Sequence, residues 1–168
     1  ETAVGAYDGS IDLTVSGTYC VTTTDLFVSV AGGNGQSGNA FNLINTSSGN
    51  LTITGFSQGG TYVNAAAAME VWMYPGDYIP VMGSSVGWTL VGSATVALIN
   101  GGYSSVIPVT GVTIPAGATY GFRVGSTASI AYATTTGVPG VTPWFSNSTL
   151  TVTEGHGGSS PLWNSFVP

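Results

Sequence analysis

The sequence has almost no positive charge. Arg123 is the single Lys or Arg among 168 residues, seven residues are Asp or Glu, and charged residues make up 5% of the chain. A soluble domain usually carries about a quarter charged residues. No basic patch can form from one arginine, which excludes recognition of a nucleic acid through its phosphates.

Long apolar runs and cysteine are also scarce. No run approaches the roughly 18 apolar residues that a membrane-spanning helix needs, so the sequence predicts no membrane insertion. Cys20 is the single cysteine and has no partner for an intrachain disulfide. Its setting in "TYCVT" favours a small buried side chain, and a bridge between chains or a reactive thiol is the alternative.

The composition nevertheless suits a folded core. The chain has 26 Gly, and 43% of its residues are hydrophobic. This is unlike disordered chains, which combine low hydrophobicity with high net charge. Helix signals are weak: "NAAAAME" (64–70) has helical propensity but runs directly into "VWMYPGDY". We interpret it as the start of a strand, with one helical turn as the alternative.

Strand signals are frequent. In "SIDLTV" (10–15), Ile11, Leu13 and Val15 alternate with polar residues and so share one face. Similar runs occupy residues 25–31, 40–45, 50–56, 69–74, 88–99, 104–114, 119–125, 129–135 and 148–153. Turn-forming segments separate them, namely "GGNGQSGN", "SQGG", "YPGD", "NGGY", "IPAGA", "GVPG" and "GHGGSS". The pattern predicts an all-β protein with a single β-sandwich of jelly-roll type and about ten strands. Residues 1–24 form an N-terminal strand-forming arm in this prediction, and residues 25–168 form the sandwich.

Six segments in order resemble a β-sandwich accessory domain that recurs in large exported bacterial proteins. They are "GGNGQSGNAFNL" (32–43), "LTITGF" (51–56), "MEVWMYPGDY" (69–78), "GWTLVGSATV" (87–96), "GVTIPAGATYGFRV" (111–124) and "FSNSTLTVTEG" (145–155), within roughly residues 26–155. The resemblance implies secretion and a sandwich fold, and it does not imply a catalytic activity. Compared with that family, the chain has an added N-terminal strand within 1–24 and lacks a last strand after "PLWNSFVP".

Catalytic and metal-binding patterns are weak. His156 is the one histidine, in "EGHGGSS", where we interpret it as a polar loop residue. The acids are scattered and offer no pair for glycoside hydrolysis. Glu70 and Asp77 flank a turn and are expected to cap or solvate it. The alternating Asp8, Ser10 and Asp12 resemble the start of a calcium loop, but its twelfth position is Tyr19, not Glu. The sequence therefore predicts neither an enzyme nor a cofactor or metal site.

Two groups of residues are candidates for surface contacts. Trp72 and Trp88 lie in apolar runs and are expected in the core, whereas Trp144 and Trp163 are flanked by turn residues and are candidate ligand contacts. The triplets "NTS", "NLT" and "NST" make Asn45, Asn50 and Asn147 candidate glycosylation acceptors.

The scarcity of charge favours a protein that packs against copies of itself. Charge keeps separate proteins apart in solution, and burying charge in an interface is costly. We therefore expect a secreted structural subunit of an extracellular filament or surface assembly. Its subunits would polymerise by donor-strand exchange, with Ile11, Leu13 and Val15 entering a neighbouring subunit. The alternative is an adhesive or carbohydrate-binding module with polysaccharide as partner.

Overall fold

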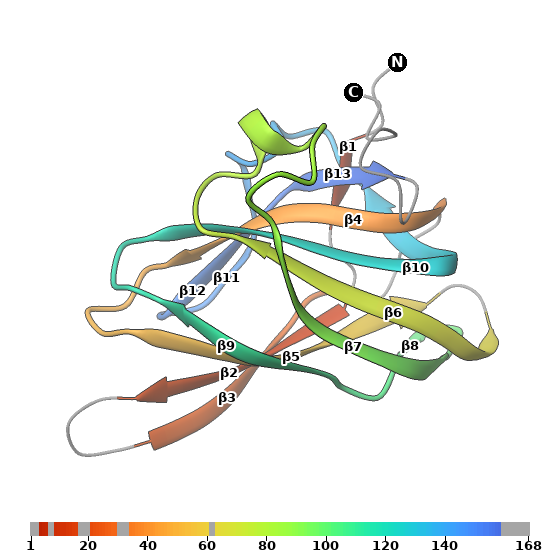
Figure 1. Ribbon diagram of the computed structural model, residues 1–168, viewed down its shortest axis with the longest axis horizontal. Helices are drawn as coiled ribbons and strands as arrows, with labels where there is room; N and C mark the ends of the chain where they lie inside the picture. The colour runs from red at the N-terminus through yellow and green to blue at the C-terminus, as the bar shows by residue number, and fades with distance from the viewer. Residues whose placement is uncertain (1–3, 7–8, 17–20, 30–33, 61–62, 159–168) are drawn as a thin grey trace.

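The computed structural model describes residues 4–6, 9–16, 21–29, 34–60 and 63–158. Over these residues the chain forms thirteen strands and one 3₁₀ turn, η1 (Ile79–Val81). The strands make two antiparallel sheets that pack face to face (Figure 1). The predicted all-β sandwich is confirmed, with more strands than the predicted ten because several are only two to four residues long.

The larger sheet has eight strands. Their spatial order is β11 (Pro143–Ser146), β12 (Leu150–Thr153), β4 (Asn34–Asn45), β13 (Gly155–Gly158), β1 (Val4–Ala6), β10 (Thr119–Thr134), β6 (Asn64–Tyr74) and β7 (Thr89–Leu98). β4 also pairs directly with β10. Strands β4, β13, β1 and β10 therefore close a ring at one end of this sheet.

The second sheet carries the N-terminal segment. β3 (Val21–Phe27) pairs with β2 (Gly9–Ser16), which pairs with β5 (Leu51–Gly60). β5 in turn pairs with β8 (Gly102–Tyr103) and with β9 (Ile107–Ile114). The predicted boundary after residue 24 falls inside β3, so the arm and the sandwich share a strand.

The core lies between the sheets. Alternate residues of a strand face opposite sides, so Phe41 and Phe122 from the first sheet meet Phe56 from the second. The Phe56 and Phe122 rings lie 5.3 Å apart between centroids, and Phe41 lies 6.3 Å from Phe56. Ile11 is fully buried in the same cluster.

Several glycine-rich segments that we expected to be turns are strands. Most of "GGNGQSGN" begins β4, "SQGG" ends β5, and "GHGG" forms β13. Glycine is needed where β13 approaches β4, because a Cβ on Gly155 would collide with the carbonyl oxygen of Ala40. The expected strands 119–125 and 129–135 are one strand, β10, with a register shift between Gly125 and Ile130.

Candidate functional site

The connection between β6 and β7, residues 75–88, folds over the outer face of the eight-stranded sheet. We call it the cover; Figure 1 shows it in green above β4 and β13. Beneath it lies a second apolar cluster of Ala40, Tyr78 and Trp88, separate from the main core. The cover thus shields side chains that the sheet would otherwise present to water.

A tyrosine–histidine pair fastens the cover to the sheet. The Tyr78 hydroxyl lies 2.7 Å from Nδ1 of His156 on β13, and the two rings meet edge to face. Tyr78 is fully buried and His156 is 6% exposed. Burial raises the pKa of Tyr78, with a further contribution from the charge of Asp77, and burial lowers the pKa of His156. Both shifts favour the neutral side chains. The tautomer of His156 sets which group donates: the hydroxyl donates when the imidazole proton is on Nε2, and Nδ1–H donates when it is on Nδ1.

Asn42 on β4 anchors the same connection. Its side-chain oxygen accepts from the backbone N–H of Tyr78 at 3.2 Å. Its amide nitrogen donates to Asp77 at 2.8 Å and to the carbonyl of Gly140 at 3.2 Å. Asp77 also accepts from the N–H of Ile79 at the start of η1. The expected turn-capping role of Asp77 is confirmed.

Arg123 lies buried in the middle of the same face. On β10 it stands between Ala40 of β4 and Trp72 of β6 and is 2% exposed. Burial lowers its pKa to about 10, and the charge of Glu70 opposes this change. Glu70 is a strand residue of β6 that accepts a 3.0 Å hydrogen bond from the Trp72 indole. Glu70 is therefore the acid whose negative charge stabilises the charged form of Arg123. Because Glu70 lies within β6, the expectation that it caps a turn is wrong.

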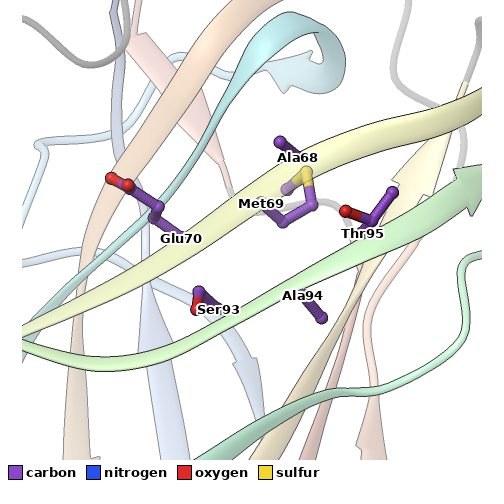
Figure 2. A pocket seen from close by; sticks show the side chains of 6 residues that line it. All are labelled: Ala68, Met69, Glu70, Ser93, Ala94 and Thr95. Atoms are coloured by element: carbon purple, nitrogen blue, oxygen red, sulfur yellow. The ribbon is translucent and has the colours of Figure 1, made fainter.

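A shallow hollow of about 250 Å³ lies between β6 and β7. Figure 2 shows its lining residues: Ala68, Met69 and Glu70 from β6, and Ser93, Ala94 and Thr95 from β7. It offers one carboxylate and two hydroxyl groups. The pair of Tyr78 and His156 does not line it.

The described residues contain no cluster of three or more His, Cys, Asp or Glu side chains that could hold a metal ion. In the same part of the chain, no helix has the length and apolarity to cross a membrane. Tyr78 and His156 are both buried, and the contact between them joins the cover to β13.

The predicted donor strand lies within its own sheet in the single chain. Ile11 is fully buried and pairs in register with Phe56 of β5. The backbones of Leu13 and Val15 pair with Ile53 and Leu51, and their side chains lie outside the described residues.

The structure describes three of the four tryptophans, and all three pack against apolar clusters. Trp88 is buried and Trp72 packs beside it under the cover. Trp144 is half-buried against the main core, and its indole Nε1 is buried with no hydrogen-bond partner among the described residues. Its neighbour Phe145 is exposed. Trp163 and Cys20 lie outside the described residues.

The three candidate glycosylation sites differ in exposure. Asn45 is fully buried, and its amide nitrogen donates to the carbonyls of Gly49 and Ile114. A glycan on this nitrogen would displace both hydrogen bonds. Asn50 and Asn147 are exposed. Glycosylation stays a prediction, and these two asparagines are the accessible acceptors for it.

The interpretation of His156 as a polar loop residue is wrong, because it is a buried residue of β13. Its glycine neighbours concealed the strand, since they show no alternation of side chains. Sequence reasoning also missed Tyr78 and Asn42, whose roles depend on pairing across 78 and 36 residues of chain. No local pattern signals such contacts.

Comparisons with models of protein families, with curated proteins and with solved structures each find no match to this chain. What the structure supports of the resemblance is the all-β sandwich of two sheets.

Proposed function

We propose that the protein is a structural subunit of an extracellular assembly, joined to copies of itself by exchange of its N-terminal strand. The observation that carries this proposal is the placement of β2. It inserts the fully buried Ile11 into the core, yet its strand partners among the described residues are only β3 and β5.

β2 is suited to exchange because, apart from β3, the next strand along the chain, it pairs with one strand of the sandwich, β5. It pairs with β5 from Gly9 to Val15, opposite Gln58 to Leu51. The same hydrogen bonds and the same pocket for Ile11 form whether β2 comes from the same chain or from a neighbour. A head-to-tail exchange of this kind repeats along a filament, unless the rotation between subunits closes a ring.

The electrostatics of the fold suit permanent packing against other subunits. Arg123, the one positive residue, is buried beside Glu70 and contributes little to the surface. Several large apolar side chains are exposed instead, including Phe27, Ile99 and Val141. A surface with few charges and scattered apolar groups offers weak protection against self-association. This composition therefore favours an assembly in which such surfaces are covered.

The test is to delete residues 1–16, which removes β1 and β2, and to supply them as a synthetic peptide. The exchange predicts a destabilised core that does not polymerise alone and that the peptide stabilises. A control peptide with Ile11→Asn should fail, because it places an amide in an apolar pocket. The proposal is wrong if the deleted protein forms the same assemblies, or if the full chain stays a monomer at high concentration.

A carbohydrate-binding module is the second candidate, and the hollow beside Glu70 favours it. A carboxylate with Ser93 and Thr95 provides polar groups of the type that fix a sugar's hydroxyls. The test is retention of the protein on polysaccharide columns. This function predicts that Glu70→Gln abolishes retention and that Asn147→Gln, a change at an exposed residue, leaves it intact. Equal retention of both variants, or none by the wild-type protein, would exclude this hollow as the site.

A further inference from the structure

The N-terminal hairpin of β2 and β3 holds two carboxyl groups side by side. Asp12 on β2 lies directly opposite Asp25 on β3 in the antiparallel register. Side chains that oppose each other in this way lie about 5 Å apart at Cβ, and like charges at such positions destabilise the pair of strands. Two ionised aspartates would therefore weaken the hairpin.

On its other side Asp12 meets no compensating group among the residues that the structure describes. On β5, Asp12 pairs with Gly55. A Cβ atom added to Gly55 would lie 3.0 Å from Oδ2 of Asp12 and would clash with the side chain of Val106. Oδ2 of Asp12 is buried and has no hydrogen-bond partner among the described side chains. This oxygen has thus lost contact with water and gained no donor in exchange, which disfavours the ionised form.

No positively charged side chain is available to the pair among the described residues. β5 and β9 contain no ionisable side chain, and Asp25 is the one such residue of β3. The chain's single positive side chain, Arg123, lies in the other sheet and interacts with Glu70. A proton is the remaining species from the chain's own chemistry that can relieve the repulsion.

We propose that Asp12 and Asp25 share a proton that fastens the N-terminal hairpin, and that loss of this proton toward neutral pH loosens it. In the fastened state one carboxyl group donates its O–H to the other carboxylate. In the loosened state two negative charges face each other between β2 and β3. This goes beyond the proposed function, because the pair has the same geometry whichever subunit supplies β5.

The direction of the pH dependence follows from the pKa. Burial, with hydrogen bonding to Asp25 and its charge, raises the pKa of Asp12 from 3.8 to about 6. The folded hairpin therefore binds the proton more tightly than the unfolded chain does. Its stability is highest below the unfolded pKa, falls as the pH rises through the folded pKa, and stays low above it.

Hydrogen exchange of the full-length protein, followed by mass spectrometry, tests this locally. Peptides from β2 and β3 should lose about tenfold in protection between about pH 5 and about pH 7.5, after correction for intrinsic exchange rates. Asp12→Asn should remove this loss and raise protection at the higher pH, and Asp25→Asn should act in the same direction. Asp77→Asn, an isosteric change at an exposed acid within the cover on the other sheet, should keep the wild-type profile.

Two outcomes overturn the proposal. One is a wild-type profile that is flat with pH or that Asp12→Asn leaves unchanged. The other is full restoration of protection at neutral pH by calcium, which would make the pair a cation site. Carboxyl-carbon NMR titration provides a second measurement: the pair should titrate in two separate steps, one near pH 6. Two coincident steps at ordinary acid pH would contradict the shared proton.

Discussion

Removing one hydroxyl group from Tyr78 should loosen the cover measurably. Tyr78→Phe keeps the fully buried ring and its packing on Trp88 and Ala40. It deletes the 2.7 Å hydrogen bond to Nδ1 of His156. Nδ1 of His156 then loses its hydrogen-bond partner at a buried position. A buried polar atom left unsatisfied costs about 1–3 kcal/mol, so we expect a loss of unfolding free energy in that range.

Urea unfolding followed by tryptophan fluorescence measures this difference. Tyr74→Phe is the matched control, since Tyr74 is half-buried beside Trp88 with a ring-centroid distance of 5.8 Å. The control should change the free energy of unfolding by less than about 0.5 kcal/mol. Equal effects of the two variants would refute the role of the Tyr78–His156 hydrogen bond in holding the cover.

Three further predictions concern the core, the glycine strand and pH. Ile11→Ala should cost about 2–5 kcal/mol of unfolding free energy, against less than about 0.5 kcal/mol for the exposed Ile99→Ala; equal costs would contradict the burial of Ile11. Gly155→Ala should cost at least about 1–3 kcal/mol, because its Cβ meets backbone of β4, whereas Gly49→Ala enters open space. Burial lowers the pKa of His156, so its contribution to stability is complete above its unfolded pKa of 6.5 and decreases as the pH falls through it. The difference in unfolding free energy between wild type and His156→Gln isolates this dependence, and a constant difference across pH would refute it.

The sequence predicts those strands whose side chains alternate. Residues 10–15 show this period and correspond closely to β2, and the apolar and β-branched run at 88–99 corresponds closely to β7. The period is local, so a short window of sequence contains it. The Ala-rich segment from Asn64 was interpreted correctly as the start of a strand, because the β-branched and aromatic residues that follow continue it into β6.

The glycine-rich strands could not be predicted in this way. In Gly155–Gly158 only His156 is not glycine, so no alternation of polar and apolar side chains can appear in the sequence. These residues form a strand because they pair with β4. The buried pair of Tyr78 and His156 likewise depends on how residues 75–88 fold over a distant strand. The local sequence does not indicate which acid lies near Arg123, and only the register of β10 against β6 places it near Glu70.

One crosslinking measurement tests the exchange of β2 most directly. Ser10 of β2 lies opposite Ser57 of β5, a geometry within the reach of a disulfide. With Cys20→Ser as background, one chain carries Ser10→Cys and a second chain of different size carries Ser57→Cys. The two are mixed before assembly and then oxidised. Strand exchange predicts covalent products that contain both chains. If the double variant Ser10→Cys, Ser57→Cys closes its own disulfide but the mixed chains form no joint product, β2 stays in its own sandwich and the proposed assembly mechanism is wrong.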